Sequence, residues 1–230
     1  DAVPLGSGVG NNRAGLLNNI LNFLVPTAGS SSLTLDSDVY SLPGRAVVEV
    51  QDLDLQGLGQ ASITIRSSQQ TNGVSVTLLE TARHGLFRGS FILSPTNATL
   101  PGTLQARAND SIQAEYFDAS ADRLLIATAS IDTNAPTIAN VVIEPGYLEA
   151  VVSWNTSKDA DALVQYSESR DSFPNNFTAY DPTLAGYHAV FLSGLKANTT
   201  YYVRVVSRDR AGNSTADDNA GKLYPFTTLQ

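Results

Sequence analysis

Cysteine and methionine are both absent from the 230 residues. Without cysteine the chain has no disulfide, no thiolate nucleophile and no thiolate metal ligand. Basic residues are also few: 14 Lys and Arg stand against 22 Asp and Glu, which gives a formal net charge of −8. A phosphate backbone requires a basic surface, so nucleic acid is not expected as a partner. Long apolar runs are missing too, and no membrane span is expected.

Residues 1–31 have a different periodicity from the rest of the chain. Five apolar residues recur at helical spacing between a capping Asn11–Asn12 pair and a terminating Pro26: Leu16, Leu17, Ile20, Leu21 and Leu24. We therefore predict one short N-terminal α-helix and a polar linker. The segment resembles the closing helix of glutamine-amidotransferase-like domains, which implies a preceding domain. The alternative, a helix that packs on the neighbouring sandwich, stays open. The lack of an initiator methionine and a signal peptide predicts a segment cut from a longer precursor.

Residues 32–133 alternate apolar and polar side chains, as strands of a half-buried sheet do. Glycine, proline and asparagine turns separate the candidate strands, which lie at 32–36, 45–51, 61–67, 74–81, 86–94, 103–108, 111–117 and 123–131. A single open sheet would expose one apolar face, so these strands predict an antiparallel β-sandwich. The motifs at 50–54, 78–90 and 109–118 make this region resemble bacterial immunoglobulin-like repeats of exported proteins.

Residues 134–230 predict a second antiparallel sandwich, with strands at 138–143, 149–154, 162–167, 178–180, 187–192, 201–208 and 223–228. Trp154 ends one strand on its inward face, and Leu195 precedes Tyr201 by six residues. A buried tyrosine at such a corner holds the turn when its hydroxyl bonds to nearby backbone. The segment resembles a fibronectin type III domain, which implies structural roles for Trp154, Leu195 and Tyr201. The fold class is thus all-β, with two tandem sandwiches.

Catalytic constellations are not readable in the sequence. The two histidines, His84 in a turn and His188 on a strand, are predicted to be surface residues without a nucleophile nearby. The paired carboxylates Asp159 with Asp161, and Asp217 with Asp218, are predicted to lie in solvated loops. We therefore expect no catalytic residue and no organic cofactor.

Two binding surfaces stay open as alternatives. Carboxylates near strand ends could converge on calcium, or serve only as turn formers: Asp36, Asp38, Asp52, Asp54, Asp118 and Asp122. Aromatic rings around the middle strands of the second sandwich could form a ligand surface or pack in the core. The candidates for that surface are Phe173, Phe177 and Tyr180.

The resemblances imply non-catalytic accessory or spacer modules at the C-terminal side of an exported multidomain protein, such as a secreted hydrolase or peptidase. The expected partner is an upstream catalytic domain of the same polypeptide, and the expected location is secreted or cell-surface. The alternative is an adhesion or carbohydrate-binding tandem that contacts a glycan or a protein surface.

Overall fold

A computed structural model describes residues 29–96, 100–170 and 177–230, and the chain divides into two compact units. Pro43–Ala129 and the described residues before Val39 form the first unit, and Ser130–Gln230 with Val39–Leu42 form the second. The predicted all-β class is confirmed: apart from one 3-10 turn, η1 (Leu53–Leu55), every regular element of the described residues is a strand. The predicted N-terminal helix lies outside the described residues.

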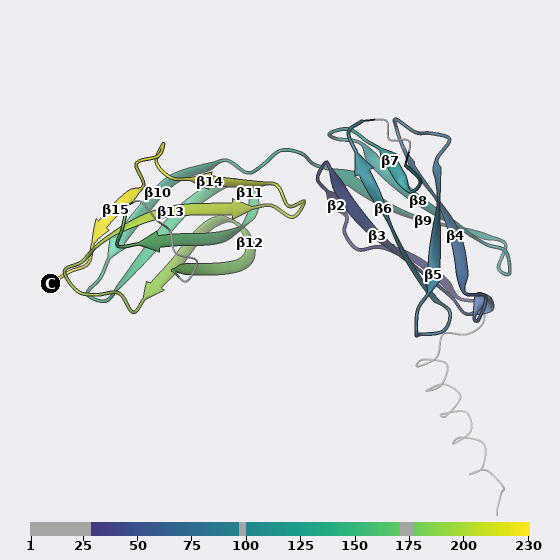
Figure 1. The fold of residues 1–230 in the computed structure, drawn as a ribbon, viewed down its shortest axis with the longest axis horizontal. Coiled ribbons are helices and arrows are strands. Elements are labelled where there is room, and N and C mark those ends of the chain that lie inside the picture. The colour runs from purple at the N-terminus through teal and green to yellow at the C-terminus, as the bar shows by residue number, and fades with distance from the viewer. Residues whose placement is uncertain (1–28, 97–99, 171–176) are drawn as a thin grey trace, which may run out of the picture. The chain divides into compact units, whose positions relative to one another are not determined.

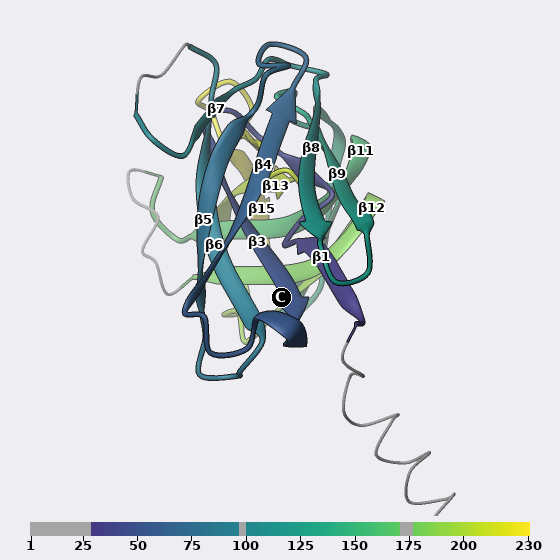
Figure 2. The same ribbon diagram turned by 90° about the vertical axis from the view of Figure 1, so that its right-hand side faces the viewer.

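Nine strands form one sheet, which is visible on the right of Figure 1 and from another side in Figure 2. They are β1 (Ser31–Leu35), β2 (Val39–Tyr40), β3 (Gly44–Asp52), β4 (Gln60–Ser67), β5 (Val74–Glu80), β6 (Leu86–Ser94), β7 (Thr103–Gln105), β8 (Ser111–Asp118) and β9 (Arg123–Ile131). All of them belong to the first unit except β2 and the last two residues of β9. Their spatial order is β1-β3-β6-β5-β4-β8-β9-β2, with β7 beside β6. The sheet folds back on itself, since the Ser31 hydroxyl of β1 donates to Asp118 of β8 at 2.5 Å.

Alternation explains which side chains fill this unit. Every second residue of β3 is buried, and the same holds for the middle of β4 and β5. Val48, Leu78 and Phe87 are completely enclosed between the layers. Enclosing one such side chain contributes about 1.5–3 kcal/mol. The predicted bounds of β6 and β9 coincide with those observed, whereas the two-residue β2 was not predicted.

The second unit contains six antiparallel strands: β10 (Ile138–Pro145), β11 (Glu149–Ser167), β12 (Thr178–Ser193), β13 (Thr200–Arg208), β14 (Ser214–Asp217) and β15 (Tyr224–Thr227). Strand β11 takes part in both layers. Its first part pairs with β10 and with the end of β12, and its last part pairs with β13 and with the start of β12.

Two strand breaks predicted here are wrong. The candidate strands 149–154 and 162–167 are one strand, β11, and 178–180 and 187–192 are one strand, β12. The prediction of a solvated loop at Asp159 and Asp161 is wrong, because both residues lie on β11 and side chains of this stretch form hydrogen bonds within the sheet. The Thr156 hydroxyl, for example, donates to the Ala185 carbonyl at 3.1 Å. Hydrogen-bonded polar side chains allow a strand to continue, with a register shift after Asn155.

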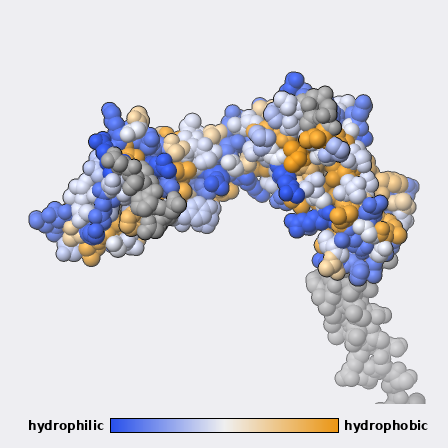
Figure 3. Space-filling view, viewed as in Figure 1, coloured by the Kyte–Doolittle hydropathy of each residue, from blue (hydrophilic) through white to orange (hydrophobic). Residues whose placement is uncertain are grey.

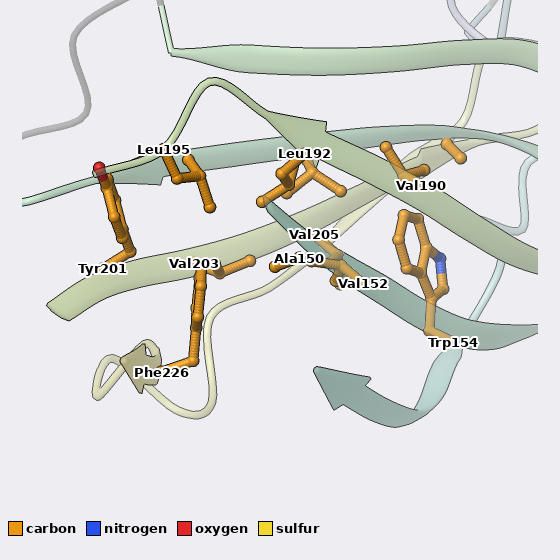
Figure 4. Close-up of a cluster of buried hydrophobic side chains, with 12 residues drawn as sticks. Ala150, Val152, Trp154, Val190, Leu192, Leu195, Tyr201, Val203, Val205 and Phe226 are labelled. Atoms are coloured by element: carbon orange, nitrogen blue, oxygen red, sulfur yellow. The ribbon is translucent and has the colours of Figure 1, made fainter. Parts of the chain in front are cut away.

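The core of the second unit places Trp154 and Tyr201 among aliphatic side chains (Figure 4). The Trp154 ring is fully buried, and its indole N–H donates to the Ser207 hydroxyl at 3.0 Å. The Tyr201 ring stacks on Phe226 with 5.6 Å between the ring centroids. Its hydroxyl accepts a hydrogen bond of 2.9 Å from the backbone N–H of Lys196. Leu195 packs in the same cluster. The turn before β13 is therefore stabilised by the buried Leu195 side chain and by the hydrogen bond to the Tyr201 hydroxyl.

Candidate functional site

The two histidines occupy different environments. His84 lies in the exposed turn after β5, and its Nδ1 is 3.6 Å from Glu80 Oε1. The prediction that His188 is a surface residue is wrong, because its side chain is 4% exposed. It shares the inward face of β12 with Val190 and Leu192, and its ring centroid lies 5.1 Å from that of Trp154.

Burial determines the chemistry of His188. It lowers the pKa of the imidazole, against the attraction of Asp181 and Asp161. Its Nε2 lies 3.3 Å from the Thr156 hydroxyl, which also donates to the Ala185 carbonyl. A general base needs access to a substrate proton, and an enclosed ring beside Trp154 lacks that access. His188 is therefore a core residue with one polar partner.

Glu80 organises the loops at one end of the first unit. Its carboxylate accepts hydrogen bonds from the backbone N–H groups of Gly57, Gly85 and Gly59, at 2.9–3.1 Å. The bond from Gly57, followed by that from Gly85, lowers the pKa of Glu80 to about 2. A carboxylate satisfied in this way holds two loops together and has no vacant oxygen with which to act on a substrate.

Three of the six carboxylates predicted for calcium lie close together. The Tyr116 hydroxyl donates to Asp52 at 2.5 Å, Ser120 donates to both Asp54 and Asp118, and Ser31 donates to Asp118. Burial, and after it the bond to Asp52, raises the pKa of Tyr116. The bonds from Ser31 and Ser120 lower the pKa of Asp118 to about 2. Hydroxyl and backbone donors thus surround these carboxylates.

The other three predicted carboxylates do not join this group. Asp36 follows Leu35, at the end of β1 away from Ser31, and its carboxylate accepts a hydrogen bond from the backbone N–H of Val47 at 2.8 Å. Asp38 comes just before β2, and Asp122 lies in the turn between β8 and β9 with a φ of 47°. Within the described ranges, no group of three or more His, Asp or Glu side chains is arranged to hold a metal ion. The calcium site stays a prediction, which a calcium titration of the melting temperature would test.

Lys158 forms a charged cluster that the sequence did not reveal. Its ammonium donates to Asp209 at 2.6 Å, to Asp132 at 2.7 Å and to the Asn134 carbonyl. Burial opposes the charge, but the bonds to Asp132 and Asp209 outweigh it and raise the pKa of Lys158. Burial would likewise raise the pKa of Asp209, yet the bonds from Lys158 and Asn213 hold it below its usual value. Asn213 also donates to the Asp132 carbonyl at 2.9 Å.

The cluster fastens residues 132–137 along β11, where Thr137 and Ser157 exchange two further hydrogen bonds at 2.9 and 3.0 Å. Asp209 and Asn213 lie at the two ends of the turn that joins β13 to β14. The function of this turn is therefore structural: it anchors the segment that enters the second unit.

The three residues predicted for an aromatic surface differ in environment, and the surface stays a prediction. Phe173 lies outside the described residues, and Phe177 stacks on Tyr166 with centroids 5.7 Å apart. Tyr180 is 59% exposed, and its hydroxyl donates to Asp161 at 3.0 Å. Two further exposed rings lie on the outward face of β12: Tyr187, which belongs to the aromatic group weighed for this surface, and Phe191, which was not predicted. The alternation of Phe191 with the buried Val190 and Leu192 would have revealed it.

A shallow hollow of about 670 Å³ lies over β3, β5 and β6 of the first unit. Arg45 and Arg88 line it, together with Leu79 and Glu80. Arg45 donates to Ser90 at 2.8 Å, and Arg88 lies 3.4 Å from Glu49. Figure 3 shows this face with hydrophilic and hydrophobic residues side by side. The hollow resembles an ordinary sheet surface more than an enclosed ligand pocket.

Comparison with known proteins gives one match confined to the second unit and others that cover most of the chain. A family model described as "Purple acid Phosphatase, N-terminal domain" matches residues 140–228. This match lies within the second unit, whose sequence resembles a fibronectin type III domain. Chitinase A1 of Niallia circulans is 27% identical over 219 residues, which cover 89% of this chain and 28% of that protein. The chain therefore spans less than a third of this relative.

Two solved structures match this chain at low sequence identity. The chicken CNTN1 FN1–FN3 domains are 14% identical, with a TM-score of 0.49 over 84% of this chain and 66% of that one. Purple acid phosphatase PPD1 from yellow lupin, Lupinus luteus, is 12% identical, with a TM-score of 0.32 over 87% and 41%. The described residues include no helix long and apolar enough to cross a membrane.

Proposed function

We propose that the two units are non-catalytic accessory modules of an exported multidomain hydrolase, and that they position a catalytic domain of the same polypeptide. The observation that carries the proposal is the alignment of 89% of this chain with 28% of a chitinase, which leaves most of that relative for other domains. The Glu80 and Lys158 clusters support a non-catalytic role, because their charged groups are hydrogen-bonded to other groups of the same unit. Among the described residues, no buried side-chain nitrogen or oxygen lacks a hydrogen-bond partner. The proposed location is outside the cell.

Positioning requires modules that hold their shape, and both units have this property. Each has its own buried core. The segment entering the second unit is fixed by Lys158 and Asn213, so it cannot behave as a free coil. The substrate class proposed for the whole protein is a polymeric glycan such as chitin, by analogy with the relative.

The test compares the complete parent protein with a variant that lacks residues 29–230. We expect the same turnover of a soluble chitin oligosaccharide by both proteins and slower release of sugar from insoluble chitin by the shortened one. The fragment alone should turn over neither substrate. Turnover by the fragment, or identical activity of both forms on the insoluble polymer, would overturn the proposal.

A second candidate function is glycan binding by the fragment itself. It is favoured by the three exposed rings of β12, Tyr180, Tyr187 and Phe191, because aromatic faces stack on sugar rings. The fragment should then sediment with an insoluble polysaccharide, and Tyr187→Ala combined with Phe191→Ala should abolish this. Tyr147, 57% exposed in the turn between β10 and β11, provides the matched control Tyr147→Ala. Failure of the fragment to sediment would exclude this function, and equal sedimentation of all three proteins would exclude the β12 rings as its contact.

A further inference from the structure

The outer face of one layer in the second unit carries two exposed aromatic rings. In this layer the first part of β11 pairs with β10 on one side and with the end of β12 on the other. Tyr187 and Phe191 of β12 are 60% and 56% exposed, and Val142 of β10 is 49% exposed. Each alternates with residues that are buried or pack against the core, so all three point outward. We define the ring face as the outward residues Val142, Ser153, Asn155, Tyr187, Ala189 and Phe191.

Strand pairing fixes the layout of the ring face. Asn155 lies opposite Tyr187, and Ser153 lies opposite Ala189. Tyr187 and Phe191 are four residues apart on β12, which separates them by about 13 Å along the strand. Ala189, the outward residue between them, is small. A ligand that contacts both rings must therefore be extended and longer than a single sugar ring.

Tyr180 does not belong to the ring face, although it lies on the same strand. It pairs with Leu163 in the last part of β11, which pairs with β13 in the other layer. Two register shifts in β11 separate that part from the part beside Tyr187. The exposed rings of β12 thus form two surfaces, and Tyr187 and Phe191 are the pair that shares one of them.

The ring face lacks positive charge. The segments 138–145, 149–155 and 187–193 contain no Lys or Arg, and their charged residues are Glu144 and Glu149. A chain of acidic sugars would meet like charges there and no cation. A neutral glycan avoids this repulsion, and its hydroxyl groups can exchange hydrogen bonds with the side chains of Ser153 and Asn155.

The area of the ring face does not suit a stable protein interface. At their exposed fractions, Val142, Tyr187 and Phe191 together present roughly 300 Å² of side-chain surface. A stable protein interface takes about 800 Å² from each partner. A second copy of the chain or another protein would thus need much more surface than this face offers, whereas a thin glycan chain would not.

We propose that the ring face binds a neutral polysaccharide chain that lies along β12 and stacks on Tyr187 and Phe191. This inference rests on the second candidate function, glycan binding, and adds to it the surface, the direction of the chain and the charge class of the ligand. Chitin, the substrate proposed above for the whole protein, belongs to this neutral class. Simultaneous contact with two rings requires several linked sugars, so a single sugar should bind far more weakly than an oligosaccharide.

The test titrates the full chain with a chitin oligosaccharide and with an oligosaccharide of galacturonic acid of the same length. We expect the chitin oligosaccharide to bind at least about tenfold more tightly than the acidic one. Tyr187→Ala and Phe191→Ala should each weaken its binding by about tenfold, because one stacking contact is lost. Phe191→Trp restores an aromatic face and should retain binding.

Tyr180→Ala is the matched control. Tyr180 is 59% exposed on the same strand but faces outward from the other layer, so this variant should bind the chitin oligosaccharide as the natural chain does. All the replaced side chains are exposed, and the urea midpoint of the second unit should be the same in every variant.

The outcomes separate this inference from the function on which it rests. If the natural chain bound no glycan, soluble or insoluble, glycan binding and the ring face would both fail. If it bound but lost binding in Tyr180→Ala rather than in Phe191→Ala, glycan binding would stand and the ring face would be wrong. Equal affinity for the acidic oligosaccharide would overturn the neutral class. A dimer in analytical ultracentrifugation that Phe191→Ala dissociates would assign the face to a second copy instead.

Discussion

A single buried imidazole makes the second unit sensitive to mild acid. The folded pKa of His188 lies below its ordinary value of 6.5, because burial disfavours the cation. The unfolded chain therefore binds the proton more readily, and stability should decline as the pH falls below about 6.5. Urea unfolding followed by Trp154 fluorescence between pH 7.5 and 5 measures this decline.

The variant His188→Leu removes the titrating group and retains an apolar side chain of similar size. The Thr156 hydroxyl keeps its bond to the Ala185 carbonyl, so no donor is left unsatisfied. We expect the decline between pH 6.5 and 5 to become nearly flat in this variant. The exposed His84 supplies the control His84→Leu, which should decline as the natural protein does. If His188→Leu retained the full decline, another group would be responsible.

The Tyr201 hydroxyl is a second residue with a measurable role. In Tyr201→Phe the ring still stacks on Phe226, but the backbone N–H of Lys196 loses its acceptor. A partly buried donor without a partner costs about 1–2 kcal/mol. Equilibrium urea unfolding should show this loss, while Tyr202→Phe on the half-buried side of the same strand should change the free energy of unfolding little. If both variants lost the same free energy of unfolding, the Tyr201 hydroxyl would have no special role in the turn before β13.

Between elements, the largest predicted effect concerns Lys158. In Lys158→Ala the nearly enclosed carboxylate of Asp209 loses its cation, and residues 132–137 lose an anchor. We expect a loss of about 2 kcal/mol, between the values for surface pairs and fully buried pairs. Limited proteolysis at 132–137 should accelerate in parallel.

The matched control is Lys196→Ala. Lys196 pairs with Glu168 at 2.8 Å, but the two side chains are 69% and 39% exposed. Such a pair contributes less than about 1 kcal/mol. If both lysine variants lost the same stability, the Lys158 cluster would be an ordinary surface pair.

At the scale of elements, the alternation of apolar and polar residues predicted most strands, but it did not predict that β11 and β12 are each one continuous strand. The bounds of β6 and β9 follow from inward residues at every second position between clear turns. Strand β11 could not be predicted, because the partners of Thr156 and Lys158 lie 29 and 51 residues further along the chain. The Lys158 cluster was missed for the same reason. His188, by contrast, was readable from the alternation that placed Val190 and Leu192 inward.

Across the whole molecule, the groups that respond to acid lie in different units and titrate in different windows. His188 belongs to the second unit, whereas Glu80 and Asp118, with pKa values of about 2, belong to the first. Lowering the pH from 7 to 5 should therefore weaken the second unit and leave the first unchanged. Trp154 fluorescence reports on the second unit, and amide exchange in β3 and β6 reports on the first.

Below pH 4.5 the first unit should weaken as well. The ordinary pKa of Glu80 is 4.5 and its folded value is about 2, so its stabilising contribution is complete above 4.5 and is lost as the pH falls towards 2. In Glu80→Gln the loops around Gly57 and Gly85 lose a charged acceptor at neutral pH. We expect this variant to be less stable than the natural protein at pH 7 and to converge with it near pH 2. Two parallel stability curves would mean that the Glu80 charge does not hold these loops, and the low pKa would need another cause.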